Sequence, residues 1–193
     1  MGAYSPLPWL DENTAMRTTV ETIAEPVVRA MRERGTPFTG LLFCGLAATS
    51  EGLKVIEFNV RFGDPETLVV LERLEGDLGQ LLHAAATGDL ANTPSLAWRD
   101  ESAVAVVLAS EGYPLAAQTG REITGLDEVR EAGCTVIHAG TERDSDGTVR
   151  SSGGRVLSVV AREKTLEDAR VRAQSAIARV LLEGSHYLSL IHI

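Results

Sequence analysis

A stretch of alternating apolar and polar residues at positions 55–62 constrains the fold of this chain more than any other feature. Successive side chains of a β-strand point to opposite faces, so the pattern predicts a strand with one apolar and one polar face. The two faces would carry Ile56, Phe58, Val60 and Phe62 on one side, and Glu57, Asn59 and Arg61 on the other. Asp64-Pro65 then has the form of an N-cap followed by proline at the first helical position, and it predicts a helix to about Leu74.

Further strands are indicated elsewhere in the chain. Leu41–Thr49, the turn Ser50-Glu51-Gly52 and Leu53–Phe62 together predict a hairpin. Three more apolar segments, two of them flanking the turn Asp144–Gly147, predict strands at Ala103–Ala109, Thr135–Ala139 and Val149–Ala161. The first residues of the chain have turn-forming Gly and Pro, so Gly2–Ser5 is expected to be a loop.

Helices are expected where apolar residues recur every three or four positions. The first runs from about Thr14 to Arg34, and Pro26 should kink or divide it. A short helix from about Leu78 to Ala86 ends at Gly88. The last begins at a capping box, Thr165–Asp168, and the residues expected to face inward are Leu166, Ala169, Ala173, Ile177 and Leu181.

Composition limits the class of protein. The chain has 193 residues, of which 44% are hydrophobic and 23% charged, and its formal net charge is −9. These proportions are ordinary for a globular protein, and the acidic balance argues against nucleic acid or an anionic membrane as the main partner. The apolar runs are too short to span a membrane, the N-terminus has no secretory pattern, and the two cysteines form no CxxC motif. We therefore expect a cytoplasmic protein with free thiols.

The polar, proline-containing segment Leu90–Arg99 divides the chain. We expect one domain over residues 1–97 and a smaller one over residues 98–187. No internal repeat is present.

The polar face of the predicted strand is the first candidate site. Glu57 and Asn59 would stand roughly 6.6 Å apart along the strand, so that their oxygens could converge on a bound cation. Mg²⁺ prefers such oxygen ligands and takes the rest of its shell from phosphates and water. Arg61 and the free N–H groups of the following helix add donors for an anion. The alternative is a solvated sheet face followed by a capped helix.

Gly153-Gly154-Arg155 is a second candidate, because backbone could approach an anion there while Arg155 contacts it. The alternative for this string is an ordinary hairpin or bulge. The histidines lack a ligand-like spacing for zinc, and no nucleophilic triad or P-loop motif is found.

Five strings together resemble one family. They are Met1-Gly2-Ala3-Tyr4-Ser5-Pro6, Val55–Glu66, Gly112-Tyr113-Pro114, His138-Ala139-Gly140-Thr141 and Gly153-Gly154-Arg155-Val156-Leu157. In this order they resemble the phosphoribosylamine–glycine ligases (glycinamide ribonucleotide synthetases), a purine-biosynthesis family of the ATP-grasp superfamily. The resemblance covers residues 1 to about 187. It implies an α/β (α+β) fold, with the C-terminal part of an ATP-grasp domain followed by a small mixed α/β domain.

The resemblance also implies a reaction. ATP, glycine and 5-phosphoribosylamine would give glycinamide ribonucleotide, ADP and phosphate through a glycyl phosphate. Glu57 and Asn59 would hold Mg²⁺ or Mn²⁺ on the ATP phosphates. The residues expected at the reacting groups are Arg61, Asp64 and Glu66. Those expected to bind substrate are Gly2, Ala3, Tyr4 and Ser5 in one segment, and Gly154 and Arg155 in the other.

The family pattern differs from this chain at both ends. In the family the Met-Gly-Ala-Tyr-Ser-Pro string lies deep inside the sequence, so we expect the N-terminal half of the same enzyme to be the missing partner and the isolated chain to be inactive. Residues 188–193 depart from the family and are expected to be a non-native tail. The alternative is a stand-alone, non-catalytic module that binds a nucleotide or a partner subunit. Another ATP-grasp ligase, such as a purine-pathway carboxylase, would fit the fold and leaves the Arg61–Glu66 string unexplained.

Overall fold

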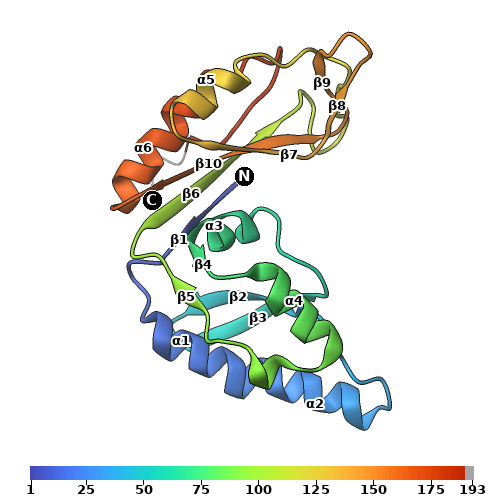
Figure 1. Ribbon diagram of the computed structural model, residues 1–193, viewed down its shortest axis with the longest axis vertical. Helices are drawn as coiled ribbons and strands as arrows, with labels where there is room; N and C mark the ends of the chain where they lie inside the picture. Colours follow the sequence, from blue (N-terminus) through green and yellow to red (C-terminus); the bar gives the residue numbers. More distant parts are fainter. Residues whose placement is uncertain (190–193) are drawn as a thin grey trace. The chain divides into compact units, whose positions relative to one another are not determined.

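A computed structural model describes residues 1–189 and divides the chain into two compact units (Figure 1). Unit 1 consists of Met1–Pro6, Asp64–Arg73 and the residues from Arg99 onward. Unit 2 consists of Leu7–Gly63 and Leu74–Trp98. The units are interleaved along the chain, so no single cut in the sequence separates them, and the domain boundary at residue 97 stays a prediction. Within residues 1–189 no helix is long and apolar enough to cross a membrane. Of the expected tail, residues 190–193 lie outside the described part.

Unit 1 is built on a four-stranded antiparallel sheet. The strands in spatial order are β1 (Gly2–Ser5), β6 (Ser102–Ala109), β10 (Arg155–Glu163) and β7 (Thr135–His138). Every residue of β6 is buried, which confirms the strand predicted from its continuous apolar run. A strand of this composition needs cover on both faces of the sheet, and unit 1 supplies it.

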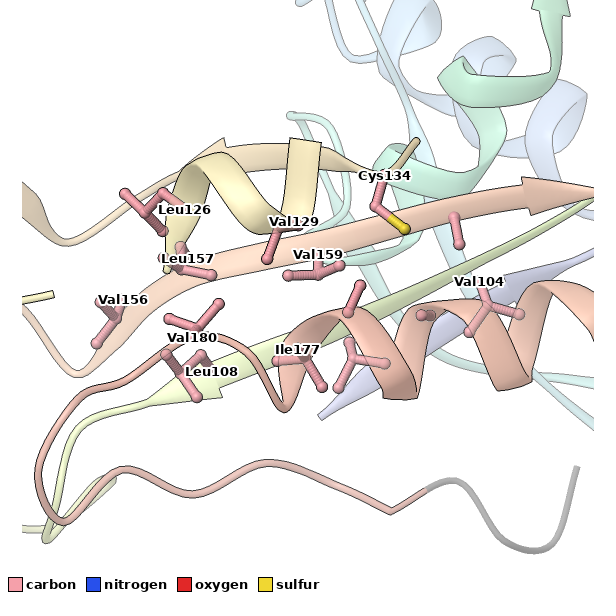
Figure 2. Packing of buried hydrophobic residues seen from close by; sticks show 14 of the residues in the cluster. Val104, Leu108, Leu126, Val129, Cys134, Val156, Leu157, Val159, Ile177 and Val180 are labelled. Atoms are coloured by element: carbon pink, nitrogen blue, oxygen red, sulfur yellow. The ribbon is translucent and has the colours of Figure 1, made fainter. Parts of the chain in front are cut away.

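One face of the sheet packs against α6 (Leu166–Ile177) and the short α5 (Leu126–Glu131). Figure 2 shows Leu108 of β6 close to Ile177 of α6, and Val104 of β6 farther along the same helix. The other face is covered by α3 (Glu66–Arg73), whose buried residue Val69 contacts small alanines of β6. Alternation along β6 therefore places Val104, Val106 and Leu108 toward α6, and Ala103 and Ala105 toward α3.

The predicted capping box begins α6. Thr165 Oγ1 accepts a hydrogen bond from the Asp168 N–H at 3.1 Å. Four of the five residues expected to face inward contact the core: Leu166, Ala169, Ala173 and Ile177. The prediction for Leu181 is wrong, since its side chain is 65% exposed. The helix ends at Ile177, so the helical spacing no longer applies, and Val180 and Leu182 are buried instead.

Two expectations in unit 1 are corrected by its sheet pairing. Gly2–Ser5 is a strand and not a loop, because it pairs with β6 in the register Ala3↔Ala105. A partner a hundred residues away leaves no local signal in the sequence. The single strand expected over Val149–Ala161 is divided at residues 152–154 into β9 (Val149–Ser151) and β10, and β9 pairs with β8 (Thr141–Arg143).

In unit 2, Pro26 divides the first helix as predicted. The helical segment consists of α1 (Glu12–Thr19), a π-helical turn η1 (Val20–Ala24) and α2 (Glu25–Glu33). The N–H of Glu25 bonds to the carbonyl of Val20, five residues back. Proline has no N–H to continue an α-helical ladder, so the wider turn and the start of α2 coincide with it.

The hairpin of unit 2 is confirmed, with a bulge that was not expected. Its strands are β2 (Phe43–Thr49) and β3 (Gly52–Asn59), which pair antiparallel. Gly45 pairs with Glu57 while Leu46 pairs with Val55, so Ile56 is an extra residue in β3. The simple alternation predicted for residues 56–62 is therefore wrong at Ile56. It also stops early, because β3 ends at Asn59.

The remaining elements of unit 2 are short. The helix α4 (Leu78–Thr87) ends at Gly88 in the left-handed conformation, as its sequence predicts. A 3₁₀ turn η2 (Leu90–Asn92) leads to β5 (Ala97–Trp98), which pairs with β4 (Leu74–Glu75).

The two units differ in how well their apolar residues are covered. Among the described residues, Ala84 is the one buried hydrophobic residue of unit 2, and all the others belong to unit 1. Many large side chains of unit 2 are exposed, among them Trp9, Met16, Val55, Ile56, Phe58, Val60, Leu90, Leu96 and Trp98. Unit 2 therefore leaves more of its large apolar side chains uncovered than unit 1 does.

The two cysteines are expected to react with thiol reagents at different rates. Both are free, Cys44 half-buried in β2 and Cys134 5% exposed in the core of unit 1. Burial raises the pKa of both thiols, so little thiolate is present at neutral pH. We expect iodoacetamide to modify Cys44 at least about tenfold faster than Cys134, as followed by mass spectrometry. In urea the two rates should converge, and equal rates in the folded chain would contradict the packing of Cys134.

Candidate functional site

Glu57 and Asn59 form a polar pair at the end of β3. The Asn59 Nδ2 donates a hydrogen bond to Glu57 Oε1 at 2.8 Å, so the two side chains meet on one side of the strand as predicted from their spacing. Glu57 is exposed and Asn59 is half-buried. Gly45 lies across from Glu57, and a Cβ there would come within 3.1 Å of Glu57 Cγ. The absence of a side chain at Gly45 therefore gives Glu57 its space, a role that the sequence pattern did not indicate.

This pair has the chemistry of a site for a hard cation. Its carboxylate and amide oxygens are the donors that Mg²⁺ takes, and two protein donors suffice when phosphates and water complete the shell. Within residues 1–189 there is no group of three or more His, Cys, Asp or Glu residues that could hold a metal ion. Glu57 and Asn59 alone would therefore leave most of the coordination shell of such a cation to other ligands.

Arg61 does not lie on the strand face where the alternation placed it. The strand has ended, and the Arg61 Nη1 donates to the carbonyl of Phe62 at 2.8 Å. The guanidinium is exposed and belongs to unit 2.

Asp64 and Glu66 belong to unit 1, at the start of α3. The helix begins at Glu66, and the Asp64 carboxylate accepts a hydrogen bond from Arg155 Nη1 at 3.0 Å. The same nitrogen donates to the Asp64 carbonyl at 2.9 Å. The structure thus joins two residues that the sequence placed in separate candidate sites. Glu66 is exposed in the first turn of α3.

The turn at Gly153 and Gly154, which leads into β10 at Arg155, is held by neighbouring residues. The buried Ser110 donates from Oγ to the Gly153 carbonyl at 2.8 Å and from its N–H to the Gly154 carbonyl at 2.9 Å. The Arg155 Nε donates to the Tyr113 hydroxyl at 3.1 Å, and this bond, with that to Asp64, raises the pKa of Arg155. A Cβ on Gly154 would overlap the Tyr113 ring, so glycine is required there.

Sequence reasoning missed Ser110 and Tyr113 as parts of this cluster. Tyr113 lies in the Gly-Tyr-Pro string that was noted as a motif, so a signal existed for it. Ser110 is a single serine after an apolar strand, and such a serine gives no signal in the sequence. Arg155 is about a third exposed, with 36% of its side chain accessible.

The predicted substrate-binding segment Gly2–Ser5 is the edge strand of the unit 1 sheet. Ala3 packs toward α3 and Tyr4 toward the α6 side of the core. Ser5 Oγ accepts a hydrogen bond from Arg73 Nη1 of α3 at 2.6 Å. The substrate contacts of these residues stay a prediction.

Two models of one family match this chain. The phosphoribosylglycinamide synthetase ATP-grasp (A) domain matches residues 1–67, and the C domain of the same synthetase matches residues 103–189. The two matches together cover more than half of the chain, in the order expected. The chain belongs to the phosphoribosylglycinamide synthetase family.

Curated relatives of the synthetase family agree with this assignment. A phosphoribosylamine–glycine ligase of Streptomyces coelicolor is 55% identical over 190 residues, which are 97% of this chain and 45% of that protein. The ligase of Leifsonia xyli is 53% identical over 97% of this chain and 45% of its own length. The chain therefore spans about 45% of the length of these synthetases.

Solved structures show the same fold. The phosphoribosylamine–glycine ligase of Thermotoga maritima superposes with a TM-score of 0.78 at 29% identity, over 97% of this chain and 45% of that one. An N5-carboxyaminoimidazole ribonucleotide synthetase of the same organism gives 0.61 at 18% identity, over 93% of this chain and 45% of that one, which shows the fold alone. This chain thus has the predicted α/β fold of ATP-grasp ligases.

Proposed function

We propose that this chain forms part of an ATP-dependent ligase that joins glycine to 5-phosphoribosylamine. The identity of 55% over nearly the whole chain to a curated phosphoribosylamine–glycine ligase carries the proposal. In the proposed reaction the γ-phosphoryl group of ATP passes to a carboxylate oxygen of glycine and ADP leaves. The amine nitrogen of phosphoribosylamine then attacks the glycyl carbonyl carbon, and phosphate leaves as the amine loses a proton.

The residues of unit 2 suit the first step. Glu57 and Asn59 would hold a divalent cation, Mg²⁺ or Mn²⁺, which neutralises charge on the ATP phosphates when bound. Their mutual hydrogen bond fixes both side chains before the ligand arrives, which lowers the cost of ordering them. Arg61 presents an exposed guanidinium that would contact the transferred phosphoryl group or the glycine carboxylate.

The residues of unit 1 suit the second step. We propose that Asp64 and Glu66 act at the incoming amine, and that Gly154 and Arg155 bind the ribose phosphate. Gly2–Ser5 would form a wall of the substrate site, with Ser5 oriented by Arg73.

We also propose that the partner of this chain is the N-terminal half of the same ligase. The chain spans about 45% of its relatives, and unit 2 exposes apolar side chains such as Ile56 at 71% and Val60 at 74%. A unit with Ala84 as its one buried hydrophobic residue in the described part gains little from the hydrophobic effect alone. Cover from the other half would bury this surface. The cytoplasmic location predicted from the sequence belongs to this proposal.

A chimera tests the ligase activity. The N-terminal part of the Streptomyces coelicolor ligase, up to the matched region, is joined to Met1, and ADP release is measured with ATP, Mg²⁺, glycine and phosphoribosylamine. We expect turnover that requires both glycine and phosphoribosylamine, and none from the 193-residue chain alone. The intact Streptomyces ligase is the positive control. A folded chimera without turnover would overturn the proposal, as would full turnover by the isolated chain.

The alternative is a stand-alone binding module, and the oligomeric state of the isolated chain distinguishes it. A module should be monodisperse at about 20 kDa, whereas a chain with an uncovered apolar surface should self-associate. Because unit 2 has many exposed apolar side chains, we expect sedimentation velocity experiments to show self-association.

A further inference from the structure

The guanidinium of Arg155 is held on two of its three nitrogens. Nη1 donates to the side chain and the carbonyl of Asp64, and Nε donates to the Tyr113 hydroxyl. Nη2 is the nitrogen that these bonds do not use. All three residues belong to unit 1. The fork of Arg155 is therefore fixed in orientation, with one nitrogen left for an oxygen of a ligand.

Tyr113 is itself held in place. Gly112, with φ of +78°, turns the chain ahead of it, and the Tyr113 N–H donates to the Ser110 carbonyl at 3.2 Å. Its ring lies where a side chain on residue 154 would be, so Gly154 and the ring are in direct contact. These contacts hold the Tyr113 ring while its hydroxyl accepts the hydrogen bond from Arg155. The Tyr113 side chain is half-buried.

We propose that Tyr113 is a positioning residue for Arg155: it holds Nε so that Nη2 is directed at a phosphate oxygen of the ribosyl substrate. This inference rests on the proposed ligase function for the identity of the substrate. Asp64 also holds the guanidinium, because its carbonyl oxygen and its carboxylate both accept hydrogen bonds from Nη1. An arginine held in this way contacts an anion through one nitrogen and not through the bidentate fork.

A measurement on the folded chimeric ligase tests the positioning without any turnover. The Arg155 Nε–H should give a distinct NMR signal that is protected from exchange with water, because it is hydrogen-bonded to Tyr113. Tyr113→Phe keeps the ring against Gly154 and removes the hydroxyl, so the signal should shift and exchange at least about tenfold faster. Tyr187→Phe, at an exposed position, is the matched control and should leave the signal unchanged. An unchanged signal in Tyr113→Phe would overturn the proposal.

Kinetic measurements on the chimeric ligase test whether the Tyr113–Arg155 pair acts in substrate binding. In Tyr113→Phe, the loss of one hydrogen bond to the charged Arg155 should raise the KM for phosphoribosylamine at least about tenfold. We expect kcat to change less than about twofold, and the KM values for ATP and glycine to stay the same. Arg155→Lys should raise the same KM at least as much, since the single lysine nitrogen cannot contact Tyr113, Asp64 and a phosphate oxygen from separate atoms. An unchanged KM for phosphoribosylamine would overturn the substrate role of the pair.

The two experiments separate this inference from the proposed function. A wild-type chimera that turns over no substrate would overturn the ligase proposal, and the NMR result would still decide whether Tyr113 positions Arg155. A uniform fall in kcat with unchanged KM values would show that the pair acts on protein stability or on Asp64, and it would overturn the assignment to the ribosyl phosphate.

Discussion

Gly125→Ala is expected to destabilise the chain by about 3–5 kcal/mol, a large fraction of the roughly 5–15 kcal/mol by which native proteins are stable. Gly125 is the N-cap of α5 and has a φ of +82°, a conformation that costs other residues energy. A Cβ there would overlap the carbonyl oxygen of Arg179, and backbone cannot move aside cheaply. Thr124 and Leu181 fix this approach through two reciprocal backbone hydrogen bonds, of 3.1 and 3.0 Å.

Gly147→Ala is the matched control for this prediction. Gly147 has a similar φ of +90°, but a Cβ there would meet no atom within 4 Å. We expect a loss of about 1–2 kcal/mol from the conformation alone. Urea unfolding of the two variants, followed by circular dichroism, measures the difference. Equal losses would contradict the close approach of Gly125 to Arg179.

Glu57→Gln in the chimeric ligase is expected to lower kcat at least about 100-fold at saturating ATP. The substitution keeps the size of the side chain and removes the one negative charge of the Glu57–Asn59 pair. A cation on the ATP phosphates would then lose its charged protein ligand. A partial recovery at high Mg²⁺ would be consistent with weakened binding, and its extent is measured by titrating Mg²⁺ at fixed ATP.

Glu51→Gln is the control for the loss of a carboxylate from the same hairpin. Glu51 is exposed in the turn between β2 and β3 and forms an ion pair with Lys54 at 3.1 Å. Exposed pairs of this kind contribute little, so activity and stability should stay within about twofold of the unmodified chimera. Equal effects of the two substitutions would show that the hairpin charge matters in general and that Glu57 holds no cation.

The elements that were predictable from the sequence are those that depend on interactions between neighbouring residues. The apolar run of β6, the capping box of α6 and the glycine that ends α4 were each recognisable from residues within one turn or one strand. The meeting of Glu57 and Asn59 was also predictable, because residues two apart in a strand share a side.

Features that depend on distant partners were not predictable in the same way. The strand β1 is a strand because β6 pairs with it, and Gly2–Ser5 carries no alternation of its own. The bulge at Ile56 depends on the register of β2, and the bond between Asp64 and Arg155 joins residues 91 positions apart. Ser110 orders the Gly153 loop through one buried hydroxyl, which composition cannot reveal.

The pairing of β1 with β6 has a consequence for the growing chain on the ribosome. Ala3 cannot pair until Ala105 has been synthesised. The strand β6 cannot pair with β10 until later still, because the residues of β10 lie about fifty positions further along the chain. At about 5–20 residues per second, Gly2–Ser5 would be unpaired for roughly 5–20 s after its own synthesis. During that time its backbone donors and acceptors are open to other strands, including those of neighbouring nascent chains. Slower translation before residue 105 should therefore increase aggregation of this chain more than slower translation after residue 163.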